Sequence, residues 1–293
     1  MTAAVLEERA SQGPSWPGRC WQYCRRHPTI VIGGGLLLLM ILIALFASYL
    51  TSDPMKLNPI KRLRVPGEGM LFGTDMYGRD IFARTLHGSR ISLAVGLSAA
   101  VVSTIFGLAI GLMAGYNRLF DAIVMRVMDG IMAIPSILLA IALVSLTGAS
   151  VQIVIVAISI PEIPRVVRLV RSVVLTIREQ PYVEAAISVG ARLPKTLLRH
   201  ILPNTLAPLI VQATYVCASA MITEAILSFL GAGTPPEIPS WGNIISEGRA
   251  YFQRAPWIIF FPGIFLAITV LAVNIMGDGL RDGVDPRIAR QMR

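Results

Sequence analysis

The sequence predicts an all-α polytopic membrane protein with six transmembrane helices. Of its 293 residues, 54% are hydrophobic and 15% are charged, and the mean hydropathy is +0.66. This composition is too apolar for a soluble domain of this length and is typical of a helical membrane protein. The hydrophobic residues also gather into charge-free runs long enough to cross a membrane, which takes about 20 helical residues.

The apolar runs give the number and order of the spans. They occupy residues 29–50, 91–115, 130–161, 205–223 and 255–277. The third run contains a turn signal, LTGAS at 146–150, but is too short for two spans. Extending it from about Ile123 to about Val170 supplies two spans. Charged residues then fall near one membrane edge, where long side chains reach the interface: Arg126, Asp129, Glu162, Arg165 and Arg168.

The distribution of Lys and Arg predicts the orientation. Six spans place both termini on one side, and with the N-terminus inside, the inner segments hold 17 basic residues against 9 outside. The positive-inside rule therefore places both termini and residues 162–204 in the cytoplasm. Residues 51–90 are an exception, with seven basic and four acidic residues on the predicted outer side.

These assignments divide the chain into five parts. The first span is full length and lacks a small-residue cleavage site, so the N-terminus is not a cleavable signal. The parts are a cytoplasmic tail at 1–28, the first transmembrane helix at 29–50, an extracytoplasmic segment at 51–90, a transmembrane core at 91–280 and a cytoplasmic tail at 281–293.

The charge and cysteine content exclude several kinds of site. The net charge of +9 comes from basic residues scattered among apolar spans, whereas nucleic-acid binding needs a clustered basic face. Cys20, Cys24 and Cys217 form no disulfide framework, and Cys20 and Cys24 with His27 supply only three possible ligands. We therefore predict no metal site.

Residues 181–204 form a polar, basic loop between two apolar spans. Val183 to Val189 is predicted to be a short helix in which Ala185 and Ala186 leave room for a close approach while Glu184 offers a carboxylate. Gly190 permits a left-handed turn. Residues 195–202 are predicted to form a second short helix, with Pro203 and Pro208 at the start of the next span. This pattern indicates either a docking loop or a basic helix lying on anionic lipid.

The spacing in this loop favours docking. Glu184-Ala185-Ala186, then Gly190, then Leu202-Pro203 resembles the EAA signature of permease subunits of bacterial ABC importers. His200 stands where that signature usually has Ile. The resemblance implies that an ATPase subunit docks on this loop, which would act as a cytoplasmic coupling helix.

Four further stretches resemble one branch of these permeases, which carries dipeptides, oligopeptides or nickel. These stretches are most similar to the second permease of the pair in such importers, the C-type subunit. The resemblance implies the type I ABC importer fold. They are 71–96, 114–143, 224–242 and 262–287. The family implies a homologous second permease, two ABC ATPase subunits that use ATP and Mg, an extracytoplasmic solute-binding protein and a location in the bacterial inner membrane. Nickel chelates and haem remain alternatives to a peptide substrate.

Several residues within the spans have structural interpretations. Gly107, Gly111 and Gly115 lie on one helix face and are expected to allow close helix packing. Pro135 and Pro161 are expected to kink or break helices.

Polar residues in or near the later spans are harder to assign. Glu224 lies about 30 Å along the fifth span, at the outer interface, where it is either a solvated helix end or part of a substrate path. The helix end is the simpler interpretation. The candidate residues of a translocation path are Glu224, Gln212 and Asn274. Trp241 is expected to be an aromatic anchor at headgroup depth in an ordered outer loop.

The sequence predicts no catalytic residue and no cofactor bound by this chain. The nearest approach to a nucleotide-binding loop, Gly190 to Thr196, has Pro194 where a second Gly is required. Hydrolase and metalloprotease motifs are also absent. The alternatives from other classes are an ion-coupled secondary transporter, which would need ionisable residues near the bilayer midplane, and a noncatalytic membrane scaffold.

Overall fold

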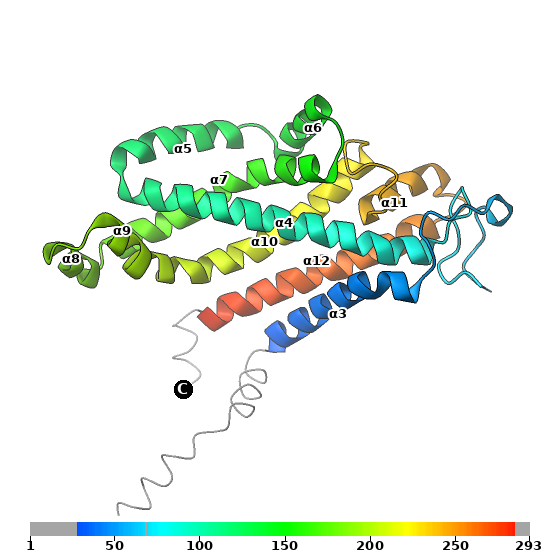
Figure 1. The fold of residues 1–293 in the computed structure, drawn as a ribbon, viewed down its shortest axis with the longest axis horizontal. Helices are drawn as coiled ribbons and strands as arrows, with labels where there is room; N and C mark the ends of the chain where they lie inside the picture. The colour runs from blue at the N-terminus through cyan, green and yellow to red at the C-terminus, as the bar shows by residue number, and fades with distance from the viewer. Residues whose placement is uncertain (1–27, 68, 285–293) are drawn as a thin grey trace, which may run out of the picture.

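The computed structural model describes residues 28–67 and 69–284, and in these ranges the fold is built from helices (Figure 1). The long helices run side by side in Figure 1, with the short helices α8 and α9 at one end and α11 at the other. We call these the α8 end and the α11 end. The helices longer than ten residues are α3 (Pro28–Leu50), α4 (Ile81–Tyr116), α5 (Arg118–Met132), α6 (Ser136–Thr147), α7 (Val151–Arg178), α10 (Leu202–Phe229) and α12 (Trp257–Val284).

Four helices of the described residues are long and apolar enough to cross a membrane, and a bent pair makes up to five. The four are α3, α4, α12 and the continuous helix Leu193–Phe229, and the bent pair is α5 with α6. Helix α7 is 28 residues long but carries charges from near its middle onward, namely Glu162, Arg165, Arg168, Arg171 and Arg178. The first span at 29–50 and the last at 255–277 agree with α3 and α12. The second helix begins ten residues earlier than the predicted 91, at Ile81.

Two of the predicted breaks in the middle of the chain, at Pro135 and near Gly148, are present. Helices α5 and α6 are bent by 86° at the residues before Ser136, as expected from Pro135, which cannot donate a backbone hydrogen bond. Helix α6 ends before Gly148, whose φ of +91° is accessible to glycine, and the Ser150 hydroxyl caps α7 by accepting from the Ile153 N–H. Helix α7 runs through Pro161 and Pro164 without a break, so of the kink or break expected at Pro161 the break is absent.

Helices α4 and α7 pack through small residues facing large ones. A Cβ atom added to Gly107, Gly111 or Gly115 would lie 2.5 to 2.7 Å from the Cβ of a valine on α7. The valines are Val166, Val170 and Val174. The glycine face therefore serves close packing as predicted, but the groups that fill it are mainly β-branched side chains and not the facing backbone.

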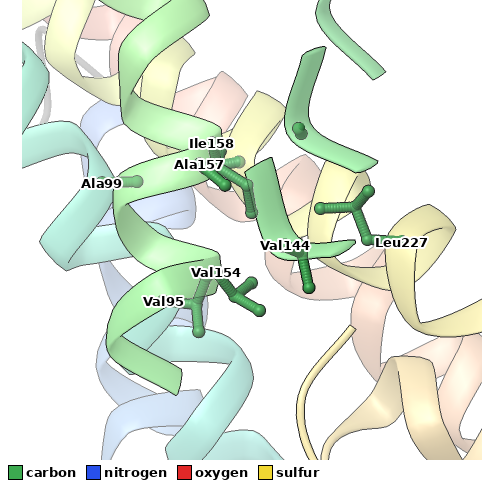
Figure 2. Close-up of a cluster of buried hydrophobic side chains, with 9 residues drawn as sticks. Val95, Ala99, Val144, Val154, Ala157, Ile158 and Leu227 are labelled. Carbon is green, nitrogen blue, oxygen red and sulfur yellow. The ribbon is translucent and has the colours of Figure 1, made fainter. Parts of the chain in front are cut away.

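A second set of contacts joins α6 to the same helices. Figure 2 shows Val95 and Ala99 of α4, Val144 of α6, Leu227 of α10 and three residues of α7 in one buried cluster. The α7 residues are Val154, Ala157 and Ile158. Because α6 is only 12 residues long, its position depends on this cluster.

A buried charge network closes the α11 end. Asp75 accepts from Arg79 and Arg84 at 2.6 and 2.9 Å, and Glu247 of α11 (Trp241–Gly248) accepts from the same two arginines. Arg90 donates to the carbonyl oxygens of Ala44 and Leu45 in α3. Three of the seven basic residues in 51–90 thus have structural partners within the chain.

Trp241 is not an interfacial anchor. Its side chain is fully buried, its indole N–H donates to the Thr85 carbonyl at 2.9 Å, and its backbone N–H donates to Ser92 at 3.2 Å. The prediction of an aromatic anchor was wrong because a chain segment distant in sequence, the first half of α4, covers the ring. Trp241 instead fixes the start of α11, a helix that the apolar pattern did not indicate.

We predict that Gly111→Ala destabilises the protein by about 1 to 3 kcal/mol, the usual cost of overpacking. The new Cβ would lie 2.7 Å from Val170, whose branched side chain has little rotamer freedom. Thermal unfolding of the detergent-purified chain measures the effect. The matched control is Gly35→Ala in α3, which meets no atom within 4 Å and should be stabilising because alanine favours helix. Equal unfolding temperatures for the two variants would contradict the packing account.

Candidate functional site

The loop between α7 and α10 begins with the helix α8 (Pro181–Ser188). Pro181 occupies the first turn, where its missing N–H costs no helical hydrogen bond. Val183 is fully buried and anchors α8, while Ala185 is exposed and Ala186 half-buried. The short helix predicted at 183–189 is therefore present, and its small residues are accessible.

Gly190 ends α8 in a left-handed turn. Its φ is +88°, and its N–H donates to the Ile187 carbonyl while the Ala191 N–H donates to Ala186. This is the Schellman arrangement, which satisfies the last carbonyl groups of a helix and favours glycine. The direction in which the chain leaves α8 thus depends on a residue that tolerates positive φ.

The second part of the loop is continuous with the next long helix. Residues Leu193–Thr196 form α9, residues Leu197–Ile201 form a π turn and α10 follows without a break. The prediction of a separate short helix at 195–202 was wrong. Pro203 has no N–H for the preceding turn and its ring crowds that turn, and a π turn relieves such crowding.

Tyr182 connects α8 to the start of α10. Its hydroxyl accepts from the Asn204 side chain at 3.3 Å, and Asn204 also donates to the His200 carbonyl at 2.7 Å. The rings of Tyr182 and His200 lie 6.3 Å apart. His200, which departs from the expected Ile, therefore lies beside an aromatic ring. The Tyr182–Asn204 contact was not foreseen, because its partners are 22 residues apart.

A groove with a volume of about 790 Å³ lies between α8 and the start of the long helix. Ala185, Ala186 and Gly190 line it together with basic residues, namely Arg192, Lys195 and Arg199. Apolar side chains are exposed nearby, including Val189 at 89% and Leu198 at 63%. A basic groove beside exposed apolar side chains suits a protein surface that offers acidic and apolar groups.

Glu184 does not line this groove. It faces a separate polar hollow of about 540 Å³ at the C-terminal ends of α4 and α7, which includes Arg171, Arg178 and Asp121. Arg171 and Asp121 are paired at 2.7 Å, and Arg178 donates to the Tyr116 carbonyl at 3.1 Å. The predicted carboxylate of the docking surface therefore lies on the opposite side of α8 from Ala186, because successive helical residues point in different directions.

The last two residues of the loop signature, Leu202 and Pro203, are divided between core and surface. Leu202 is half-buried and packs against a cluster that includes Val166, Val170 and Ile201. Pro203 is exposed. The signature residues thus belong to three environments: the groove, the hollow beside Arg171 and the start of α10.

Glu224 is buried and is not a solvated helix end. Its carboxylate accepts from the hydroxyls of Ser228 and Ser240 at 2.9 Å each and from Ser92 at 3.5 Å. Its exposure is 0%. The expectation failed because α4 and the 230–240 segment both fold over this position. Gln212 and Asn274, the other candidates for a translocation path, are half-buried on α10 and α12.

Helix α7 carries charged residues from near its middle onward, and several of them are paired. Arg165 donates to both oxygens of Glu162 at 3.1 and 3.2 Å, and Ser219 of α10 donates to Glu162 at 3.2 Å. Arg168 is paired with Asp129 of α5 at 2.6 Å. Glu162 is 11 residues from the start of α7, near its middle, and the i,i+3 spacing of Glu162 and Arg165 is the sequence signal that could have revealed the pair.

Comparison with protein families gives two matches. Residues 107–290 match the binding-protein-dependent transport system inner membrane component family. Residues 16–66 match the N-terminal transmembrane domain of oligopeptide transport permease C. The two matches together span most of the chain.

Individual proteins are similar over nearly the whole length. A probable peptide ABC transporter permease of Sinorhizobium fredii is 60% identical over 267 residues, which are 91% of this chain and 92% of that protein. A dipeptide transport system permease of Alkalihalophilus pseudofirmus is 43% identical, covering 90% and 88%. A glutathione transport system permease of Pectobacterium atrosepticum is 39% identical, covering 98% and 96%.

A solved structure shares the fold. An inward-facing conformation of the MetNI methionine ABC transporter aligns with a TM-score of 0.55 at 20% identity, over 72% of this chain and 96% of the other. Because the family match covers more than half of the sequence and the relatives cover nine-tenths of it, the chain belongs to the family of binding-protein-dependent transport system inner membrane components, as a multi-pass permease and not as the ATPase.

Proposed function

We propose that this chain is the C-type permease subunit of an ATP-driven importer of di- or oligopeptides. The observation that carries the proposal is the similarity over about nine-tenths of both chains to permeases named for peptides and dipeptides. The match of residues 16–66 to oligopeptide transport permease C supports the same assignment. The relative named for glutathione is consistent with a short peptide as substrate. Nickel chelates and haem are the alternative cargoes.

The proposed topology has six spans. One of the six is α7, which is not among the candidate spans selected by length and hydropathy. Helix α7 is long enough to cross the membrane, and its valine face is covered by the glycines of α4. The bent pair α5 and α6 is the third span. Both termini and the loop between α7 and α10 would then be cytoplasmic, and the α11 end extracytoplasmic, in a permease of the type I importer fold.

The loop between α7 and α10 would couple this permease to an ATPase subunit. Only two residues separate α7 from α8, and the second half of the loop is one helix with α10. A displacement of α8 would therefore tilt α7 and α10 with it, and would switch the path between inward-facing and outward-facing states. The Tyr182–Asn204 contact supports such a connection by tying α8 to α10.

The partners follow from the family. A binding-protein-dependent system includes ATPase and binding-protein components. We assign one of the two ATPase subunits to the groove beside α8, and the other to the homologous second permease. ATP and Mg would be used by the ATPase subunits and not by this chain. A homologous second permease would complete the path, and an extracytoplasmic solute-binding protein would deliver the peptide.

The topology is tested by cysteine labelling. In a chain with Cys20, Cys24 and Cys217 replaced by Ser, an impermeant thiol reagent added to intact cells should modify Gly67→Cys and Pro236→Cys. It should not modify Lys195→Cys until the membrane is opened. Modification of Lys195→Cys from outside would overturn the six-span orientation.

The substrate class is tested by growth. A strain that lacks this chain and has no parallel peptide importer should fail to grow on a short peptide that supplies a required amino acid. Uptake of the free amino acid should be unchanged, which controls for general membrane damage. Normal growth on the peptide would favour nickel chelates or haem as the cargo.

The coupling loop is tested at Gly190. A Cβ there meets no atom within 4 Å, so Gly190→Val acts only through the backbone at φ +88°, at a cost of about 1 to 3 kcal/mol. We expect weaker copurification of the ATPase and loss of ATP hydrolysis stimulated by loaded binding protein, at normal membrane abundance. The matched control is Gly190→Asn, which tolerates a left-handed conformation.

A second variant tests the groove itself. Ala186→Leu should overpack the contact and have the same effect as Gly190→Val, again by about 1 to 3 kcal/mol. Glu184→Ala should be milder, because Glu184 is exposed and lies outside the groove. Transport at the unaltered rate by both Ala186→Leu and Gly190→Val would show that the loop is only a connector.

A further inference from the structure

The exposed face of α7 is polar, unlike the exposed faces of the other long helices. Within residues 161–178, the exposed residues include Arg165, Arg168, Ser172 and Thr176, with Leu175 as the large hydrophobic among them. On α4 the large exposed side chains are hydrophobic and include Leu97, Val101, Ile105 and Phe106. Helix α3 exposes leucine, isoleucine and phenylalanine. Helices α3 and α4 thus present surfaces suited to lipid, and α7 does not.

The depth of the polar face follows from the packing of α7 on α4. Ser103 lies midway along the charge-free run at 91–115, and its hydroxyl donates to the Ser159 carbonyl at 3.2 Å. Arg165 is six residues beyond Ser159, about 9 Å along the helix, and Arg168 is about 14 Å along. Half of the hydrocarbon layer is about 15 Å thick. Arg165 therefore lies within the hydrocarbon layer, and Arg168 lies near its edge.

Charged groups at this depth do not face lipid. The Arg165 side chain is 42% exposed, and those of Arg168 and Asp129 are 45% and 49% exposed. Ionisable side chains within membrane spans face a water-filled cavity or other protein groups. The face therefore belongs to a polar space, and its half-exposed charges of both signs match a solute that carries both signs.

We propose that this face of α7 lines the substrate path and that Arg165 and Arg168 receive the C-terminal carboxylate of the peptide. This inference rests on the proposed function and adds residues to it. Asp129, which is paired with Arg168 at 2.6 Å, adds a carboxylate to the same face, so the site offers charges of both signs. We therefore assign the polar part of the path to this face of α7 and not to Glu224, because other residues of the chain bury the Glu224 carboxylate.

The geometry of Arg165 suits this role. Among the described residues, Arg165 donates only through Nη1, and both of those contacts go to Glu162. Glu162 is nearly buried and is also held by Ser219, so the guanidinium is fixed at one edge. Its remaining N–H groups are available to a carboxylate, which arginine binds through two parallel hydrogen bonds.

Accessibility is the first test. In the complete transporter with Cys20, Cys24 and Cys217 replaced by Ser, single cysteines are placed at Arg165, Arg168 and Ser172. A charged methanethiosulfonate reagent should modify all three in the inward-facing state, and bound peptide should slow the reaction. Val101→Cys and Ile105→Cys on α4 are the controls and should remain unmodified, because thiols in lipid do not ionise. Absence of modification at all three α7 positions would mean that a partner helix or lipid covers the face, and would overturn the proposal.

Carboxylate recognition is the second test. Transport of a tripeptide with a free C-terminus is compared with transport of its C-terminal amide, using the same binding protein so that its own preference cancels. The preference for the free carboxylate should fall about tenfold in Arg165→Gln or Arg168→Gln, the size expected for loss of a charged hydrogen bond. Arg165→Lys keeps the charge and should retain part of the preference.

The outcomes separate this inference from the proposed function. If the unaltered transporter moves neither peptide, the proposed function fails. If it moves peptides and the preference is unchanged in both glutamine variants, the function stands and the assignment of Arg165 and Arg168 is wrong. If Arg165→Gln fails to fold, Arg168→Gln still tests the assignment. Loss of Arg168 leaves no buried partner unpaired, because both Arg168 and Asp129 are half-exposed.

Discussion

The packing of α4 against α7 is the contact on which the rest of the structure depends. Helix α7 carries several charges and would be a poor transmembrane helix alone, because ionisable groups are costly in lipid. Glycines at 107, 111 and 115 let the valines of α7 approach closely, so the apolar side of α7 is covered by protein. The charged side is then turned away from α4, toward α5 and α10, where its ion pairs and the contact with Ser219 form.

At the α11 end, too, polar groups inside the protein are stabilised by partners within the chain. Arg84 and Glu224 are fully buried, and each is held by partners that include distant segments. The arginine is paired with Asp75 and Glu247, and the carboxylate accepts from Ser228 of its own helix and from the distant Ser92 and Ser240. A buried polar group without such partners is costly. The two clusters therefore bind the 71–80 and 230–248 segments to α4 and α10, and they close one end of the bundle while the α8 end carries an open groove.

The placement of α8 links the two functional regions. It leaves α7 two residues beyond Arg178, and α7 carries Arg165 and Arg168 on its exposed face. After α8 the chain enters a helix that is continuous with α10. Ser219 of α10 donates a hydrogen bond to Glu162, the partner of Arg165. The proposed docking groove and the proposed peptide contact are thus at two points of the same two helices, which gives a direct physical route for coupling between them.

The sequence by itself determined the features that depend on local chemistry. Apolar runs located α3 and α12, Pro135 and the residues around Gly148 marked the breaks, and Gly190 marked a left-handed turn. The loop signature and the four similar stretches identified the family. Tertiary structure alone decided that Glu224 and Trp241 are buried, that Glu184 faces away from Ala186, and that Arg165 is half-exposed and paired with Glu162. These outcomes depend on which distant segments cover each side chain: Glu224 meets Ser92, which is 132 residues away. Helix periodicity and turn chemistry are set by neighbours in the chain, whereas burial is set by neighbours in space.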